Sequence, residues 1–494
     1  MVVDTTTHTR SSGAGLHPPP PVSTGAPTSG WRALDHRQRC VLACTLSANA
    51  LVFFDQTSVT VALPAIGRDL GAEADLLPWV ITSYLLALAV FMIIAGRIAD
   101  HYGRRDTFLA GLVLFGVGSA LCAAAPTLEL LIAARFVQGM GGAVVAPLAL
   151  SNTTRAVSDA QRGWAVGVFA AGGATFLVLG PLLAGALLAV AGWRWLFLVN
   201  LPVVAFAVIM CWRAVTPSRE SDPQPLRWHP VGLLLVGLGA FVLGCVELGT
   251  ASTGLVAPAL LLGGLAVLAV FVRVELRAAA PLIQLRLLRD PMLATSLTAL
   301  FAIQFAVFAV TVPLALYLQH GLGLGPVAAG LVLALAGLGT PLLSVLIGRT
   351  TDRTGPRPLT LPGLGLATVA LLAVALLAPL GGVGVLLPGL LVFAVTRPLV
   401  FTPASTGPFL TLGGERRAFA ASLGTEARQL GAVLGVALAG TALVAVHGTA
   451  LVEGDAALVE GFQAAVLVAA VVCAGATVVV RWRMPAGRGT AAAR

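Results

Sequence analysis

Fourteen apolar runs follow one another along the chain, separated by short segments rich in Arg, Gly, Pro, Asp and Ser. A helix of about 20 apolar residues crosses the roughly 30 Å hydrocarbon core of a bilayer, so runs of this length predict transmembrane helices. The pattern therefore predicts an all-α polytopic membrane protein. The predicted spans are 40–63, 77–94, 107–125, 128–148, 164–190, 195–211, 231–248, 256–272, 292–318, 327–347, 361–380, 383–401, 424–446 and 462–480.

The composition also places the chain in a membrane. Of its 494 residues 57% are hydrophobic, and the mean hydropathy is +0.94. In soluble domains only about 45–50% of residues are apolar. All 30 basic residues are Arg, and the net charge is +9. Most of these Arg residues lie in loops between apolar runs, as in membrane proteins. We therefore expect the chain to contact a lipid bilayer and not a nucleic acid.

The distribution of Arg among the loops predicts the orientation. Alternate loops hold many Arg residues, such as Arg104, Arg105 and Arg162, whereas the opposite loops hold few beyond Arg68 and Arg194. Arg-rich loops stay on the cytoplasmic side. We therefore expect a multi-pass protein of the cytoplasmic (inner) cell membrane with both termini cytoplasmic. The N-terminal tail lacks an apolar run and is rich in Pro, Gly, Ser and Thr, which predicts disorder rather than a cleaved signal peptide.

Two copies of a charged loop indicate an internal duplication. GRIADHYGRRD begins at Gly96 and GRTTDRTGPR at Gly348, and both contain G-R-x-x-D-x-x-G-x-R after the second span of a six-span unit. Parallel repeats with a substrate cavity between them are a transporter architecture. We predict a disordered cytoplasmic tail at 1–34, a six-helix bundle at 35–228, two inserted transmembrane helices at 229–276, a second six-helix bundle at 277–482 and a cytoplasmic tail at 483–494.

Further motifs identify a resemblance. GRIADHYGRR fits G-x-x-x-D-x-x-G-R-[RK], and RFVQG from Arg135 fits R-x-x-Q-G. GPLLAG from Gly180 fits G-P-x-x-G-G loosely, with Phe176 and Ala184 where glycines are usual. DQTSVTVALP from Asp55, together with GWRWLFLVNLP, PLIQLR and ARQLG, adds to the pattern. Over about residues 35–482 the chain resembles the major facilitator superfamily, and within it the fourteen-span drug:proton antiporters.

The resemblance implies a fold and a function. The expected fold is two six-helix bundles plus two inserted helices, fourteen transmembrane helices in all. The expected function is secondary active export of lipophilic small molecules, such as drugs or antibiotics, coupled to proton influx by alternating access. The resemblance also implies a cytoplasmic gate that stabilises the outward-facing state, with the two glycines permitting a tight turn and close helix approach. A topology anchor without a switching role is the alternative. The gate residues are Gly96, Arg97, Asp100, Gly103, Arg104 and Arg105.

Asp55 and Arg135 are the candidates for proton coupling. Asp55 lies roughly 12 Å and Arg135 roughly 10 Å from the outer ends of their predicted spans, at 1.5 Å per residue. The two charges can therefore meet at one depth. An isolated ion in the membrane interior is costly, so a paired or cavity-facing Asp that carries a proton is expected. The alternative is a permanent ion pair that only holds two helices together.

Other intramembrane residues receive narrower predictions. Gly180, Pro181 and Gly185 make the fifth span kinkable and closely packed. The resemblance implies that this helix acts as a proton-leak barrier, and simple helix packing is the alternative. Glu426 and Arg428 are expected to cap or anchor the thirteenth span. The predicted substrate cavity contains Tyr84, Gln138, Gln304 and Arg397, with a structural partner as the alternative role for Arg397.

Some classes of function are disfavoured. The chain contains no Lys and so no G-x-x-x-x-G-K-[ST] loop, which argues against ATP-driven transport by this chain. No catalytic constellation is visible, so we expect that the protein is not an enzyme and that it holds no cofactor or metal. We also expect a monomer. One alternative function is export of a specific metabolite or anionic natural product, with Arg397 and Arg135 as anion ligands. A less favoured one is a transport-incompetent membrane receptor on the same fold.

Overall fold

The computed structural model describes residues 30–71, 76–218, 226–248, 254–278, 280–413, 415–447 and 455–485. These residues are almost entirely helical, and no strand occurs among them. The all-α prediction is therefore confirmed. The first group of helices comprises α1 (His36–Leu70), α2 (Trp79–Tyr102), α3 (Arg104–Ala124), α4 (Leu128–Ala156), α5 (Asp159–Ala191), α6 (Arg194–Leu198) and α7 (Asn200–Ala214).

The remaining helices form the inserted pair and the second group. The inserted pair is α8 (Trp228–Glu247) and α9 (Val256–Arg277). The second group comprises α10 (Pro291–Leu316), α11 (Pro326–Gly337), α12 (Gly339–Thr354), α13 (Arg357–Leu377), α14 (Val383–Thr406), α15 (Pro408–Thr411), α16 (Glu415–His447) and α17 (Asp455–Arg483). Short turns of other helix types are η1 (Trp31–Ala33), η2 (Leu285–Arg289), η3 (Tyr317–Gly321) and η4 (Ala378–Leu380).

Thirteen helical segments of the described chain are long and apolar enough to cross a membrane. They correspond to thirteen of the fourteen predicted spans. The remaining predicted span, 424–446, lies within α16, which is 33 residues long and carries Glu426 and Arg428. Two predicted spans are interrupted: α6 and α7 share one, and α11 and α12 share another. The second interruption falls at Leu338. A Cβ on the next residue, Gly339, would collide with the carbonyl group of Ala394 in α14.

Local sequence explains where several helices begin. The Asp35 carboxylate accepts a hydrogen bond from the Gln38 backbone N–H at 2.6 Å and begins α1. The Asp290 carboxylate accepts one from the Leu293 N–H at 2.8 Å and begins α10. Such side chains satisfy N–H groups that have no partner within the helix. Gly103 separates α2 from α3 with a φ of 101°, which favours glycine.

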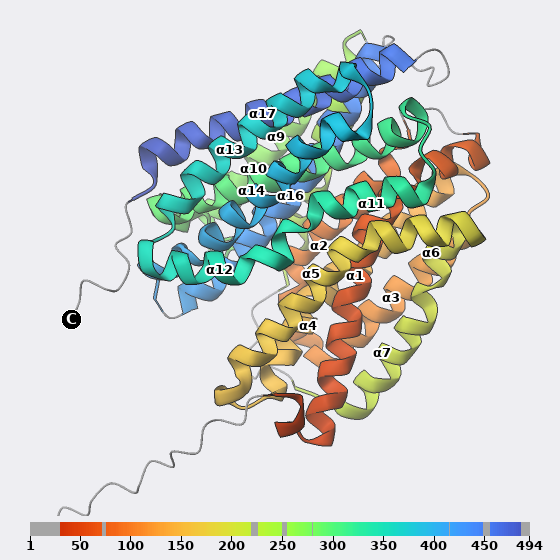
Figure 1. Cartoon of the computed structure of the whole chain (residues 1–494). Helices are drawn as coiled ribbons and strands as arrows, with labels where there is room; N and C mark the ends of the chain where they lie inside the picture. Colours follow the sequence, from red (N-terminus) through yellow and green to blue (C-terminus); the bar gives the residue numbers. More distant parts are fainter. Residues whose placement is uncertain are drawn as a thin grey trace, which may run out of the picture.

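The helices form two bundles that meet at one end (Figure 1). In the first bundle α1 packs against α4, α5 and α7, and in the second α10 packs against α14, α16 and α17. We call the end where α1 ends and α2 begins the Asp69 end, and the end where α2 ends the Asp100 end. The bundles approach each other through α5 with α11 and α2 with α16. Their ribbons diverge toward the Asp100 end.

The inserted helices pack as a pair beside the two bundles. Glycines bring α8 and α9 together, since a Cβ on Gly264 would lie 2.6 Å from the Phe241 backbone nitrogen. α8 also contacts α2 and α16. Thr441 of α16 donates a hydrogen bond to the Cys245 carbonyl oxygen of α8. The inserted pair therefore adjoins both halves of the molecule.

The predicted tails are only partly within the described residues. The stretch 1–29 and the stretch 486–494 lie outside them. The prediction of disorder throughout 1–34 is wrong for its last residues, because η1 is helical and Leu34 is buried. Leu34 packs with Leu42 and Val157, so the chain is fixed to the first bundle just before α1 begins.

Candidate functional site

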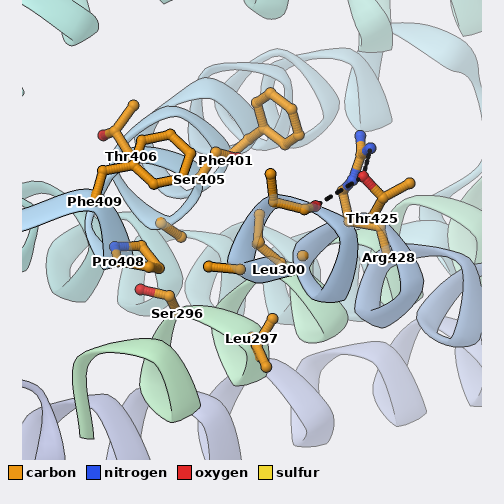
Figure 2. Close-up of a pocket in the computed structure, with 14 residues that line it drawn as sticks. Ser296, Leu297, Leu300, Phe401, Ser405, Thr406, Pro408, Phe409, Thr425 and Arg428 are labelled. Atoms are coloured by element: carbon orange, nitrogen blue, oxygen red, sulfur yellow. Dashed lines mark hydrogen bonds between the residues drawn. The ribbon is translucent and has the colours of Figure 1, made fainter. Parts of the chain in front are cut away.

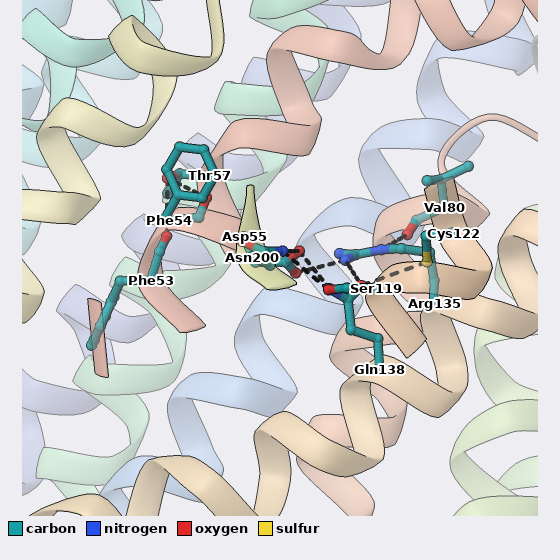
Figure 3. Close-up of polar contacts among 10 residues, drawn as sticks. All are labelled: Phe53, Phe54, Asp55, Thr57, Val80, Ser119, Cys122, Arg135, Gln138 and Asn200. Carbon is teal, nitrogen blue, oxygen red and sulfur yellow. Dashed lines mark hydrogen bonds and ion pairs between the residues drawn. The ribbon is translucent and has the colours of Figure 1, made fainter. Parts of the chain in front are cut away.

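A cluster of buried charged and polar side chains lies inside the first bundle (Figure 3). Arg135 of α4 donates from Nη1 to Asp55 Oδ2 of α1 at 2.6 Å, and both side chains are 1% exposed. The Arg135 guanidinium also lies 4.2 Å from the centre of the Tyr84 ring, and its Nε donates to the Val80 carbonyl oxygen at 3.0 Å. The predicted meeting of the two charges is confirmed. The ring and the carbonyl supply the further contacts that a buried ion pair needs.

Three uncharged side chains complete the cluster. Gln138 donates from Nε2 to Asp55 Oδ1 at 2.8 Å and to Ser119 Oγ at 2.7 Å. Asn200 Nδ2 donates to Ser119 Oγ at 3.1 Å and lies 3.5 Å from Asp55 Oδ1. Gln138 Oε1 accepts from Arg135 Nη1 at 2.5 Å. All three are fully buried. Ser119 and Asn200 are not predicted from the sequence, because the only signal of each is a single polar residue within an apolar run.

Glycines allow the helices of this cluster to approach closely. A Cβ on Gly118 of α3 would lie 2.6 Å from the Cα atom of Gln138 in α4. A Cβ on Gly139 would collide with the Tyr84 carbonyl oxygen of α2. Because both neighbours are main-chain atoms, they cannot move aside as a flexible side chain can. These two glycines therefore bring α2, α3 and α4 within hydrogen-bonding reach of one another.

A cavity lies between the two bundles. Its walls come from α1 and α5 of the first bundle and from α10, α11 and α14 of the second. Asp55 does not line it, but the next two residues of α1, Gln56 and Thr57, do. Near the Asp69 end the bundles touch, because Gly185 of α5 fits against the Pro326 carbonyl and Gly330 of α11 fits against the Pro181 carbonyl. The cavity therefore adjoins both the charge cluster and the contact between the halves.

The structure corrects the predicted cavity residues. Arg397 of α14 lines the cavity. Tyr84 and Gln138 do not, since both are fully buried in the charge cluster. Gln304 of α10 is 8% exposed and also lies outside the cavity wall. The position of a residue within its apolar run predicts its depth in the membrane, whereas helix packing decides which side chains face the cavity.

Three charged residues of the second bundle lie well inside their helices, away from the helix ends. Arg397 lies on α14, and Glu426 and Arg428 lie on α16. All three are partly exposed. The expectation that Glu426 and Arg428 cap the helix is wrong, because α16 begins at Glu415 and Glu426 lies about three turns inside it. Arg428 lies on a pocket between α10, α14, α15 and α16 (Figure 2).

The charged loop at the Asp100 end connects several elements. Arg104 bonds Asp100 at 2.7 Å and the Ser151 hydroxyl of α4 at 2.7 Å. Arg105 donates to the Trp212 carbonyl oxygen of α7 at 3.1 Å, and Arg97 donates to that of Pro281, beyond α9. The loop is thus tied to its own bundle and to the segment that follows the inserted pair.

A buried carboxylate orders that segment. Glu275 of α9 has a fully buried side chain, and its Oε2 accepts from the Ile283 backbone N–H at 2.9 Å. Arg227, just before α8, lies 3.7 Å from Glu275 Oε1 and donates to the Ala280 carbonyl oxygen at 3.3 Å. Sequence reasoning missed Glu275, whose position near the end of a span is typical of an exposed anchor.

The loop glycines differ in what they require. Gly103 has a positive φ. A Cβ atom added to it would lie 3.4 Å from the Ser218 carbonyl oxygen. Gly96 lies inside α2 with open space around it, so the prediction that it permits close helix approach is wrong. In α5, Gly180 packs against Thr57 of α1, whereas Gly185 lies at the contact with α11. The glycines of α5 therefore serve packing both within and between the bundles.

Two repeated helical bundles with a cavity between them and a buried charge pair beside it define a membrane transport protein of the secondary-transporter class. The sequence model of the Major Facilitator Superfamily matches residues 45–436, and the chain belongs to this superfamily. Members move small molecules across membranes. The chain is accordingly a multi-pass membrane protein that belongs to a family of transporters.

Two curated relatives carry names from drug resistance. The chain is 30% identical over 414 residues to "Multidrug resistance protein Stp" of Mycobacterium tuberculosis (strain CDC 1551 / Oshkosh), covering 83% of this chain and 77% of the relative. It is 32% identical over 447 residues to "Puromycin resistance protein pur8" of Streptomyces alboniger, covering 87% and 88%.

Solved structures share the fold at low sequence identity. A bacterial homolog of the human lysosomal transporter Spinster, in an inward-facing and unoccupied conformation, matches with a TM-score of 0.67 and 16% identity. The match covers 92% of this chain and 98% of that one. The E. coli xylose transporter XylE, partially occluded and inward open, matches with a TM-score of 0.61 and 14% identity over 91% and 99%.

Proposed function

We propose that this protein is a secondary active exporter of lipophilic small molecules, drugs or antibiotics among them, that couples export to proton influx by alternating access. It acts as a monomer in the cytoplasmic membrane with both termini cytoplasmic. The names of the relatives support drug efflux. The Arg-rich loops support a cytoplasmic Asp100 end.

The observation that carries the proposal is the position of Asp55. Its carboxylate is almost completely buried, paired with Arg135, and one residue away from the cavity wall at Gln56. Ionisable groups inside a membrane mark proton or substrate pathways, because burying them without a function is costly. A carboxyl group there can bind a proton from one side of the membrane and release it to the other.

Protonation of Asp55 would loosen α1 without isolating Arg135. The neutral carboxyl group no longer attracts the guanidinium, but Arg135 keeps the Tyr84 ring, the Val80 carbonyl and Gln138 Oε1 as partners. The cost of an unpaired buried cation is thereby reduced. Gln56 and Thr57 of the same helix line the cavity. A shift of α1 therefore changes the cavity wall that the cargo contacts. Proton binding and cargo binding are coupled through this one helix.

The loop at the Asp100 end serves as the cytoplasmic gate in this proposal. Asp100 and Arg104 keep about a third and a quarter of their side-chain surface exposed. Ion pairs of this exposure are worth only about 0–1 kcal/mol, so they can be exchanged during a transport cycle. We propose that the loop changes partners when the bundles close at this end.

Transport by purified protein in proteoliposomes tests the proposal. Three fluorescent lipophiles, one cationic, one neutral and one anionic, are followed under an imposed pH gradient with and without a protonophore. We expect gradient-dependent, protonophore-sensitive movement of at least one of them by the wild type. Asp55→Asn should abolish the dependence on the gradient.

Asp69→Asn is the matched control, because Asp69 makes its ion pair with Arg194 at the exposed end of the same helix. It should transport like the wild type. A normal gradient-driven rate in Asp55→Asn, at equal protein content, would show that Asp55 is not the coupling group. Failure of the wild type to move any of the three lipophiles would contradict the exporter itself.

A further inference from the structure

The charged residues of the second bundle are arranged differently from those of the first. Arg397 lies on α14 and carries a positive charge, as does Arg428 on α16, where Glu426 lies two residues before it. Within the described part of the chain none of the three makes an ion pair closer than 4 Å, although Arg428 and Glu426 attract each other at longer range. Neither Arg397 nor Arg428 therefore has a counter-charge in direct contact among the described residues.

Arg428 is the better accommodated of the two cations. Its guanidinium lies 5.1 Å from the centre of the Phe401 ring, and Nη2 lies 3.4 Å from the Thr425 hydroxyl oxygen, as Figure 2 shows. The neighbouring Glu426 attracts it. A cation over an aromatic face with a carboxylate nearby is partly compensated. Arg428 is thus partly compensated by the Phe401 ring and the Thr425 hydroxyl group.

Arg397 has no such partners. It lines the cavity between the bundles, and among the described residues it has no hydrogen bond or ion pair. The charge that acts on it most directly is Arg428, which repels it. A guanidinium in a low-dielectric cavity attracts an anion more strongly than it would in water. It presents five N–H donors in a planar fork that matches a carboxylate.

The rest of the cavity wall suits an apolar body with a few polar groups. Phe308 and Phe393 contribute aromatic rings from α10 and α14. Thr57, Thr60 and Thr311 contribute hydroxyl groups from α1 and α10. Sites of this kind bind small molecules through apolar contact and fix their orientation with a few polar groups.

We infer that the cargo is a carboxylate-bearing amphiphile whose carboxylate binds Arg397 and whose apolar body lies against Phe308 and Phe393. This inference rests on the proposed function and names the class of its cargo. Arg135, the other anion ligand considered from the sequence, is not available for this role because Asp55 already occupies it. An incoming carboxylate supplies Arg397 with the counter-charge that the described residues do not provide.

The test compares two probes with the same apolar body, 1-pyrenebutyrate and its methyl ester. Binding to the purified protein is measured by fluorescence titration, and transport in proteoliposomes under a pH gradient. We expect the wild type to prefer the carboxylate over the ester by about tenfold, the range of one charge-assisted bidentate contact. Arg397→Gln should bind the two probes equally while keeping its affinity for the ester.

Two further variants keep the result interpretable. Arg349→Gln makes the same chemical change at an exposed position of α12 and should retain the preference. Arg397→Lys keeps the charge without the planar fork and should retain part of it. Equal binding of both probes by the wild type, or an unchanged preference in Arg397→Gln, would overturn the inference. The exporter proposal survives either result provided that gradient-driven transport of any lipophile persists.

Discussion

The two bundles contain their charges in opposite ways. In the first, Asp55 and Arg135 are 1% exposed and bonded to each other, to Gln138 and to a backbone carbonyl. In the second, Arg397 is partly exposed on a cavity wall, and within the described chain it has no hydrogen bond or ion pair. The first arrangement is closed to a ligand, whereas the second is open to one.

This difference separates two uses of intramembrane charge. A charge whose donors and acceptors are all satisfied by neighbours holds helices in register, and its removal leaves a buried partner uncompensated. A charge with no protein partner does not stabilise the fold and can lower its stability, but it can bind a ligand without first breaking a bond. Under the proposed function, protonation of Asp55 breaks the bond that holds α1 to α4, whereas Arg397 binds the cargo without a bond being broken first.

The largest expected effect comes from Arg135→Leu. It removes the partner of a buried carboxylate together with the contact on the Tyr84 ring. We expect the free energy of unfolding to fall by about 3–5 kcal/mol, the usual cost of breaking a buried pair. Chemical unfolding in mixed micelles measures it. A loss smaller than about 1 kcal/mol would mean that the cluster is not structurally important.

The same substitution in the second bundle should act in the opposite direction. Arg397→Leu replaces a cation without a protein partner by an apolar residue that a membrane helix favours. Stability should be unchanged or should rise, by up to about 3 kcal/mol. If the same unfolding assay shows a loss as large as that of Arg135→Leu, Arg397 has a structural partner and the contrast between the bundles fails.

Gly139→Ala tests whether close helix approach is needed to build the first cluster. Its Cβ would collide with the Tyr84 carbonyl oxygen, so we expect a loss of about 1–3 kcal/mol from overpacking. Gly96→Ala is the control, because nothing lies within 4 Å of its Cβ position. It should gain about 0.5–1 kcal/mol from higher helix propensity. Equal losses in the two variants would contradict the packing described for α2 and α4.

Asn200→Ala should have a moderate effect. It removes a donor to Ser119 in a fully buried network, which typically costs about 1 kcal/mol. Ser405→Ala, on the pocket wall of the second bundle, removes a hydroxyl that has no hydrogen bond to the described residues, and should change stability by less than about 0.5 kcal/mol. Melting temperatures in detergent distinguish the two. A larger loss of stability for Ser405→Ala than for Asn200→Ala would contradict the view that the polar network of the first bundle stabilises the protein more than the polar side chains on the pocket wall of the second.

The smallest expected effect on stability is that of Asp100→Asn. Its pair with Arg104 is partly exposed, so we expect a loss of no more than about 1 kcal/mol. Under the gate proposal the transport rate should nevertheless change severalfold, which proteoliposome assays can measure. Unchanged transport together with unchanged stability would reduce this loop to a topology anchor.

Much of the fold and part of the site follow from the sequence. Apolar run lengths predicted the spans, and the depths of Asp55 and Arg135 predicted their meeting. Ser119 and Asn200 were missed because one polar residue in an apolar run does not reveal which way it points. Tyr84 and Gln138 were assigned to the cavity for the same reason. The burial of Glu275 depends on the Ile283 N–H and Arg227, which lie in segments whose approach no periodicity predicts.

The sequence by itself determined the class of protein, the number of apolar runs, the duplicated loop and the depth of each charge. These properties are local or additive along the chain, since membrane thickness fixes span length and rise per residue fixes depth. Only the tertiary structure decided the rotation of each helix about its axis and the distance between neighbours. Helix rotation and spacing depend on backbone contacts at residues such as Gly118 and Gly139. They are the reason that the Asp55 pair is buried away from any ligand, whereas Arg397 faces the cavity.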